Sequence, residues 1–198
     1  MADETSPKPP LALVETPPLK VHVMHDIETW AKDSPTPMLL SLGAVKFSRE
    51  GILEKFHIRF DTEDCQRFGL AIEAGTVEWW MDPERAEARA QLAAMGKIDL
   101  YAGLDGFAMW IAETEADQLG SVWSNGSNFD NAKLKAIYHK MSIAWPFSYK
   151  QEECYRTMKN RFPDVEMVRQ GIHHGALDDA HSQALHLIDI CARHGIEL

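Results

Sequence analysis

Three consecutive extended runs near the start of the chain limit most strongly the folds that this sequence can adopt. They cover residues 20–27, 38–47 and 52–60, and the third alternates apolar with polar residues as a half-exposed strand does. Residues 48–51 between the last two runs have the Gly and polar content of a hairpin turn. Gly43 interrupts the second run and marks either a bulge or a close approach by another segment. The pattern predicts an antiparallel three-strand meander.

Helical signals dominate the rest of the chain, with one further short strand expected at residues 121–124. Asp82 followed by Pro83 is a strong helix start, because Asp caps free N–H groups and Pro suits the first helical position. Thr76 and Asn128 are predicted to cap two other helices. A meander followed by helices and a strand predicts an α/β fold with a mixed sheet. The expected helices span residues 76–80, 83–95, 100–116, 129–141, 152–161 and 177–193.

The composition is that of a globular protein, with 45% hydrophobic and 25% charged residues among 198. We expect one domain over residues 19–198, preceded by a flexible Pro-rich tail over residues 1–18. No apolar run approaches the length that spans a bilayer, and the start lacks the pattern of a secretory signal. We therefore expect a cytoplasmic protein without a membrane partner. The three cysteines form no Cys-x-x-Cys pair, which argues against a zinc knuckle or a disulfide framework.

The formal net charge of −10 restricts the kind of nucleic-acid contact that the chain can make. A protein that coats nucleic acid through a broad basic surface relies on Lys and Arg to neutralise phosphates, and this composition argues against that class. A nuclease is not excluded. Enzymes that hold metal ions in a carboxylate pocket need local negative charge, and the metal ions then meet the phosphate.

Two acids, Asp26 and Glu28, close the first extended run. Residues two apart on a strand point to the same side, so both carboxylates would aim at one spot. Like charges held together raise the energy of both ionised forms. A chain tolerates such a pair when the acids share a proton or when a divalent cation lies between them. The alternative is a strand end that runs into a solvated turn.

A third acid, Asp130, follows the short strand in the first turn of an expected helix. A carboxylate at this position is stabilised by the free backbone N–H groups of the helix N-terminus. An ordinary acid at a helix start is therefore one interpretation. The other interpretation is a site residue, because Asn125 can aim an amide at a ligand and Phe129 can form the side of a nucleotide pocket.

A histidine pair, His173 and His174, lies just before two acids at the start of the last expected helix. Histidine titrates near neutral pH and can serve as a general base, although the group could also be ordinary solvated polarity. The spacing permits two pairings, His174 with Asp179 or His173 with Asp178. Helical geometry leaves both open.

The three elements occur in one order along residues 20–192: Asp26-x-Glu28-Thr29, Asn125-x-x-x-Phe129-Asp130 and His174-x-x-x-x-Asp179. This set resembles the three motifs of the DEDDh, or DnaQ-like, 3′–5′ exonucleases. Residues 77–80 and 123–131 look similar to one branch of that family, the exodeoxyribonuclease VIII-like enzymes of prophages and the DexA exonuclease of T-even phages. The resemblance implies an RNase H-like fold, in which a central mixed sheet of the meander plus parallel strands is flanked by helices.

The resemblance also implies a mechanism. It favours the pairing of His174 with Asp179, and leaves Asp178 as a neighbour and His173 as a loop residue. Two ions, Mg²⁺ or Mn²⁺, would lie ~4 Å apart and clamp the attacking and leaving oxygens. His174 would take the proton of the attacking water, and a nucleoside 5′-monophosphate would leave from the 3′ end. The four metal ligands implied are Asp26, Glu28, Asp130 and Asp179.

Substrate contacts are expected from Thr29, Trp30, Asn125 and Phe129. For Trp79 and Trp80 two interpretations stand: stacking on a base of the substrate, or packing in the core. His25 departs from the family pattern, because it places a cation beside the metal pocket unless its side chain points to the opposite face of the strand.

The partner expected from the resemblance is the 3′ end of DNA or RNA, with single-stranded DNA or 3′ overhangs favoured. One alternative is an exoribonuclease that trims RNA ends. Another is a nuclease-like interaction module with weak or no catalysis, and the last is an acidic adaptor in which the motifs are coincidental. The oligomeric state is open, with a homodimer as one option.

Overall fold

The computed structural model describes residues 19–126 and 128–198, so the predicted tail over residues 1–18 and Ser127 of the predicted turn lie outside the described residues. Six strands form one mixed sheet in the order β4-β3-β2-β1-β5-β6. The strands are β1 (Val21–Thr29), β2 (Leu39–Ser48), β3 (Gly51–Phe60), β4 (Lys97–Ile98), β5 (Leu119–Ser124) and β6 (Glu152–Cys154).

The predicted meander is confirmed. Strands β1, β2 and β3 pair antiparallel along nearly their whole lengths, whereas β5 adds to the other side of β1 in parallel and β6 adds to β5 in parallel. Strand β1 is therefore central, with β2 and β5 as its neighbours. Its carboxyl end, residues 26–29, pairs with β2 and extends past the end of β5, and the first predicted acid pair is located there.

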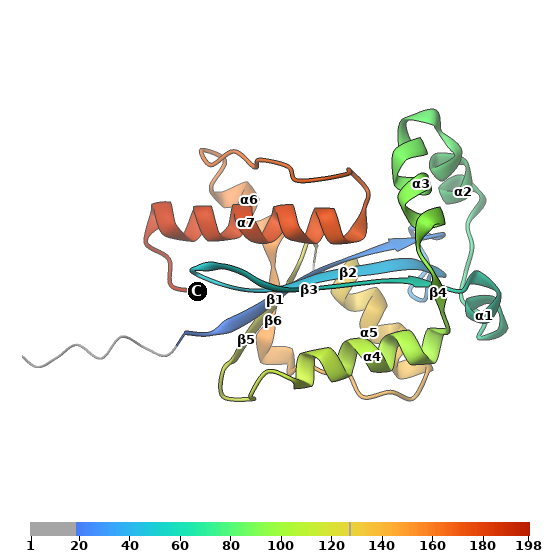
Figure 1. Cartoon of the computed structure of the whole chain (residues 1–198), viewed down its shortest axis with the longest axis horizontal. Coiled ribbons are helices and arrows are strands. Elements are labelled where there is room, and N and C mark those ends of the chain that lie inside the picture. Colours follow the sequence, from blue (N-terminus) through green and yellow to red (C-terminus); the bar gives the residue numbers. More distant parts are fainter. Residues whose placement is uncertain (1–18, 127) are drawn as a thin grey trace, which may run out of the picture.

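Helices cover both faces of the sheet (Figure 1). Helices α6 and α7 lie on one face and α4 and α5 on the other, while α1, α2 and α3 lie at the end of the sheet where β4 pairs with β3. Among the helices of the described chain, none combines the length and apolar character needed to cross a membrane. The helices are α1 (Thr62–Arg67), α2 (Ala74–Met81), α3 (Ala86–Ala94), α4 (Leu100–Ala112), α5 (Asp130–Lys140), α6 (Tyr155–Arg161) and α7 (Ala176–His194), with 3-10 turns η1 (Pro83–Arg85) and η2 (Tyr149–Gln151).

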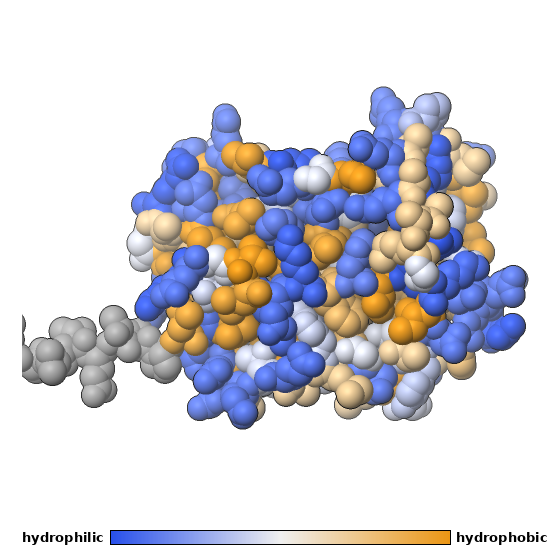
Figure 2. Space-filling model, in the orientation of Figure 1, coloured by the Kyte–Doolittle hydropathy of each residue, from blue (hydrophilic) through white to orange (hydrophobic). Residues whose placement is uncertain are grey.

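The alternation of side chains along β1 builds two separate cores. Val23 and Ile27 point to the face covered by α4 and α5, and Met24 points to the face covered by α7. The outer surface mixes the two kinds of residue, and Figure 2 shows hydrophilic and hydrophobic residues intermingled over one face. Because Asp26 and Glu28 share the parity of Met24, they lie on the α7 side of the sheet.

Gly43 of β2 lets α7 approach the sheet closely. A Cβ atom placed on Gly43 would lie 2.1 Å from the backbone nitrogen of Leu177, which is the second residue of α7. The close approach predicted for this glycine is therefore present. It brings the first turn of α7, with its acids, directly above the carboxyl end of β1.

Two predicted helices are wrong at their ends. The predicted helix over 152–161 begins only at Tyr155, because Glu152–Cys154 pair with β5 as β6. A three-residue segment with two glutamates is too short to show the alternation of apolar and polar residues that predicts a strand. Strand β6 is therefore recognisable only by its pairing with β5. The predicted helix over 100–116 ends at Ala112, and a turn follows before β5.

Helix caps were predicted with mixed success. Asp82 is confirmed as a cap: its side chain accepts a hydrogen bond from the Glu84 backbone N–H at 2.9 Å, although the turn it starts is η1, which precedes α3. The caps predicted at Thr76 and Asn128 are wrong. Helix α2 begins earlier, after Glu73, and α5 begins after Phe129. Neither Glu73 nor Phe129 makes a side-chain cap bond.

Candidate active site

Four predicted acids meet at the carboxyl end of β1, and we call Asp26, Glu28, Asp130 and Asp179 the acid cluster. Carboxylate oxygens of Asp26, Glu28 and Asp179 lie within 4.8 Å of one another. Asp130, the first residue of α5, lines the same cleft, and its Oδ1 accepts a 3.4 Å hydrogen bond from the Ile27 N–H. Residues more than 150 positions apart in the chain are thus brought together by β1, α5 and α7.

Glu28, Asp130 and Asp179 are buried and Asp26 is half-buried, and the pKa of every member of the acid cluster is raised. Burial, followed by the charges of Asp130 and Asp179, raises the pKa of Asp26 well above its ordinary value. Burial, followed by the charge of Asp26, has the same effect on the pKa of Glu28. Burial raises the pKa of Asp130 to about 7, and it also raises the pKa of Asp179.

This donor set fits a divalent cation. The cluster offers only oxygen ligands, which Mg²⁺ and Mn²⁺ prefer, and crowded carboxylates gain most from a nearby positive charge. Side chains of the protein offset part of this negative charge. Gln183 donates to Asp26 Oδ1 at 3.2 Å, and Arg169 forms an ion pair with Asp179.

Gln183 and Arg169 were missed by the sequence analysis. Gln183 follows Asp179 by four residues on α7, so the helical spacing could have placed both on one face. Arg169 lies in the irregular segment before α7, where no periodicity predicts its position. Its only sequence signal is that it is the one Lys or Arg between Phe162 and Gly175.

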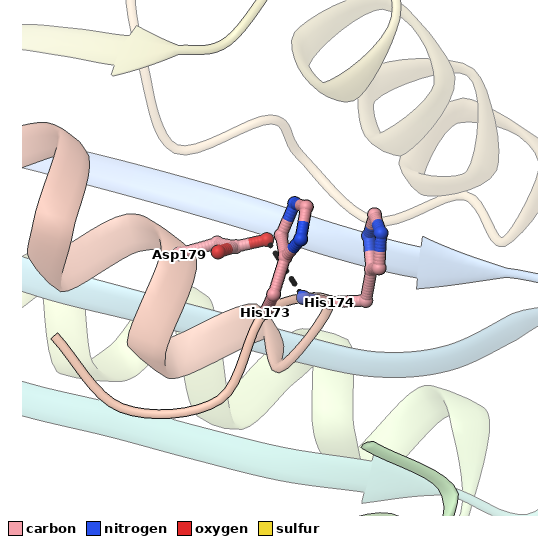
Figure 3. Close-up of side chains that lie close together, drawn as sticks. All are labelled: His173, His174 and Asp179. Atoms are coloured by element: carbon pink, nitrogen blue, oxygen red, sulfur yellow. Dashed lines mark hydrogen bonds between the residues drawn. The ribbon is translucent and has the colours of Figure 1, made fainter. Parts of the chain in front are cut away.

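Two imidazoles project from the loop that leads into α7 (Figure 3). The rings of His173 and His174 stack with centroids 3.8 Å apart, and the His174 backbone N–H donates to Asp179 Oδ2 at 3.2 Å. His174 has a φ of 65°, which is uncommon outside glycine and is often found at functional sites. Asp178 instead accepts from Gln91 at 2.9 Å and from the Ile172 N–H at 3.0 Å, so it secures this loop.

His174 is uncharged near neutral pH. Burial, followed by the positive neighbours His173, Arg85 and Arg169, lowers the pKa of His174 to about 4. The imidazole is therefore neutral at pH 7, as a general base must be. His173 lines the same cleft, with its ring stacked on that of His174.

His173, His174 and Asp179 form a second group whose ligand atoms lie within 4.8 Å of one another. Two imidazoles and a carboxylate suit Zn²⁺ better than Mg²⁺. Because Asp179 belongs to both groups, an ion bound by the histidines would compete with one bound by the acid cluster.

His25 points away from the cleft, to the opposite face of the sheet, so it does not place a cation beside the proposed metal site. The imidazole is fully buried on the opposite face, and its Nε2 lies 2.5 Å from Asn131 Oδ1. Burial lowers the pKa of His25 to about 4, so the ring is a neutral donor at pH 7. The bond joins the residue before Asp26 to the residue after Asp130, which ties β1 to α5 directly behind the acid cluster.

Two hollows flank Glu28, and both are also lined by Ile27 and Phe129. The acid cleft, of about 310 Å³, contains the acid cluster and both histidines. The Trp cavity, of about 690 Å³, lies on the other side and is lined by Thr29, Trp79 and Trp80 among others.

Of the predicted substrate residues, Thr29 and Phe129 line the Trp cavity, and Asn125 and Phe129 line the acid cleft. Trp30 lines neither, and its ring packs edge-on against Trp80 at 6.3 Å, which supports the cavity wall from behind.

The two tryptophans of α2 have different surroundings. Trp80 is 1% exposed, and its Nε1 donates to the Thr29 carbonyl at 2.9 Å, so it anchors the cavity wall to β1. Trp79 is 38% exposed and packs edge-on against the His174 ring at 4.8 Å. The Arg85 guanidinium lies 4.0 Å from the centre of the Trp79 ring. Trp79 is thus the tryptophan that a bound molecule can reach.

A family model described as the 3′–5′ exoribonuclease Rv2179c-like domain matches residues 21–191 of the chain. This range begins at the first residue of β1 and ends within α7, so it contains the whole acid cluster and the histidine loop. No curated protein sequence matches the chain.

Several solved nucleases have similar structures. The nuclease domain of 3′hExo, a DEDDh family member bound to rAMP, has a TM-score of 0.64 at 14% identity, and the match covers 92% of this chain and 96% of that one. E. coli Exonuclease I in complex with a dT13 oligonucleotide has a TM-score of 0.60 at 13% identity over 89% of this chain and 42% of that one. A 3′-exonuclease that recognises a histone mRNA stem-loop has a TM-score of 0.54 at 15% identity over 91% and 84%. The predicted RNase H-like fold is therefore confirmed.

Proposed function

Since the chain belongs to the Rv2179c-like 3′–5′ exoribonuclease domain family and is a 3′–5′ exonuclease, we propose that it uses divalent cations to shorten single-stranded RNA. The observation that carries the metal dependence is the acid cluster, in which four buried or half-buried carboxylates share one cleft. Such a cluster is costly for the fold unless a cation or bound protons compensate it.

The residues of the chain divide the reaction between them. Divalent ions held by the acid cluster would supply Lewis-acid stabilisation of the phosphoryl oxygens. His174 takes a proton from the attacking water, whose oxygen forms a bond to the phosphorus. The P–O3′ bond breaks, and the released 3′ oxygen of the shortened strand takes up a proton. The other product is a nucleoside 5′-monophosphate.

The Trp cavity is the proposed site of the 3′-terminal nucleoside. It adjoins Glu28, and it presents the faces or edges of Trp79 and Phe129 together with Thr29. Stacking of a base on an aromatic side chain contributes about 1–3 kcal/mol and tolerates any base. Asn125 lines the acid cleft on the other side of Phe129 and contacts the phosphodiester in this arrangement.

RNA is proposed as the polymer because the matching family is described as an exoribonuclease. Single-stranded DNA is the second candidate. It is favoured by the similarity of residues 77–80 and 123–131 to the phage and prophage branch, and by the structural match to Exonuclease I with its dT13 oligonucleotide.

An end-labelled assay tests the proposal. RNA and DNA of one sequence, each labelled at the 5′ end, are incubated with the protein in Mg²⁺, Mn²⁺ or EDTA. A ladder that shortens from the 3′ end only with a divalent ion supports the proposal, and the faster polymer identifies the substrate. Asp26→Asn is the matched inactive variant. Binding of both polymers without cleavage in any metal would contradict the proposal and favour the interaction module.

A further inference from the structure

Helix α6 places two cations beside the acid cluster. Arg156 and Lys159 lie three residues apart, so they share one face of the helix, and both line the acid cleft. We call this pair the basic face of α6. It is unexpected in a chain that has 30 Asp and Glu against 20 Lys and Arg.

The basic face is held firmly in position. Tyr155, at the start of α6, is 1% exposed, and its hydroxyl lies 2.6 Å from His186 Nδ1 on α7. The Arg156 guanidinium donates to the Asn125 carbonyl at 2.6 Å, which places it over the loop that leads to Asp130. Arg156 is close enough for its charge to lower the pKa of Asp130, against the larger effect of burial.

Among the described residues, neither cation is held in an ion pair. Within residues 19–126 and 128–198, no carboxylate lies within ion-pair distance of Arg156 or Lys159. Arg169 in the same cleft differs, because it is paired with Asp179. Two unpaired cations that face one cleft are suited to an anionic ligand that spans both.

The relation between the two hollows indicates which anion this is. The Trp cavity and the acid cleft meet at Glu28 and Phe129, so a strand whose terminal nucleoside occupies the cavity continues into the cleft. The basic face lines the acid cleft and is absent from the lining of the Trp cavity. Single-stranded nucleic acids are commonly held by cations along the backbone combined with aromatic stacking, and the cleft and the cavity offer these two components separately.

We propose that Arg156 and Lys159 bind the backbone phosphates on the 5′ side of the scissile bond. The proposal rests on the proposed function, because it uses the polarity of a strand with its 3′ end in the Trp cavity. Phosphate contacts carry no sequence information, so they give affinity for a longer strand without base preference. The chain therefore gains a specific site for a polyanion despite its net negative charge.

Salt-dependent binding tests the proposal independently of catalysis. A fluorescent single-stranded RNA of about 12 nucleotides, long enough to pass both hollows, is titrated in EDTA at several KCl concentrations. In the double variant Arg156→Gln/Lys159→Gln, the slope of log Kd against log salt concentration should fall by about 0.7 per lost contact, or about 1.4 in all. Arg161→Gln, an exposed residue of the same helix outside the cleft, should keep the wild-type slope.

A comparison of substrates separates this site from the reaction itself. The double variant should raise KM for the same RNA about tenfold or more, and this increase should exceed any change in KM for a nucleoside 5′-(p-nitrophenyl phosphate), which has no upstream phosphate. Unchanged salt slope and KM, in a double variant with wild-type Tm, would overturn the proposal. If the wild-type protein hydrolyses neither substrate, the proposed function fails, and the salt slope still reports on the basic face.

Discussion

Substituting Gly43 by alanine should displace the acid cluster without touching it. The added Cβ would lie 2.1 Å from the Leu177 nitrogen and 2.3 Å from the Ala176 carbonyl carbon. Non-bonded heavy atoms normally approach to about 3.5 Å, so the start of α7 must retreat by about 1 Å or more. Both neighbours are backbone atoms, and no change of rotamer can relieve the clash.

The displacement carries with it Asp179, one of the four proposed metal ligands. Asp179 follows Leu177 by two residues in the first turn of α7, and His174 lies just before the helix. A misplacement of about 1 Å at a reacting group can cost about 10²-fold in rate. Overpacking costs about 1–3 kcal/mol, which is less than the 5–15 kcal/mol by which a domain is typically stable, so the variant should still fold.

The assay for Gly43→Ala is kcat/KM on labelled single-stranded RNA together with Tm. The expected result is a loss of about 10²-fold in kcat/KM with a lowered Tm. Gly106→Ala is the control, because a Cβ there meets nothing within 4 Å and alanine favours the α4 helix. Wild-type kcat/KM and Tm in Gly43→Ala would refute the claim that this contact positions α7.

Three other predictions follow from the site. His174→Ala should lose about 10²–10⁴-fold in kcat and keep its calorimetric Mn²⁺ affinity, whereas His173→Ala should lose much less; equal losses would remove His174 as the base. Raised carboxylate pKa values stabilise the metal-free protein below the unfolded pKa near 4, and this contribution is lost as pH rises through the folded pKa, which is about 7 for Asp130. The gain in Tm on adding Mg²⁺ should therefore grow from about pH 5 to about pH 8, and a constant gain would contradict this linkage. His25→Leu and Asn131→Leu should each cost about 1–3 kcal/mol in urea unfolding because each leaves a buried polar partner unpaired, and the double variant should cost less than their sum; additive losses would show that the pair does not interact.

The parts of the fold that were predictable depend on local patterns. The meander follows from runs with a strand period and a turn between them, and Asp26 and Glu28 follow from the two-residue repeat of a strand. Strand β6 has no such pattern, because its three residues become a strand only by pairing with β5. The predicted caps at Thr76 and Asn128 were wrong because α2 begins after Glu73 and α5 after Phe129, and the residue type alone does not fix where a helix begins.

The site was predictable only as a set of separate motifs. Each acid has an ordinary local explanation, and a shared cleft requires the crossing of β1, α5 and α7. Residues without a motif were missed even where they contact the cluster, as with Gln183 and Arg169. His25 shows the opposite case, since its place in the sequence suggested interference with metal binding and its buried orientation removes that conflict.

Anomalous diffraction from crystals soaked in Mn²⁺ tests the central claim most directly, namely that the acid cluster is a divalent-metal site. Two peaks are predicted among the carboxylates of the acid cluster, and Asp26→Asn should weaken or remove them. Peaks bound only by His173 and His174 with Asp179, with none beside Asp26 and Glu28, would contradict the account.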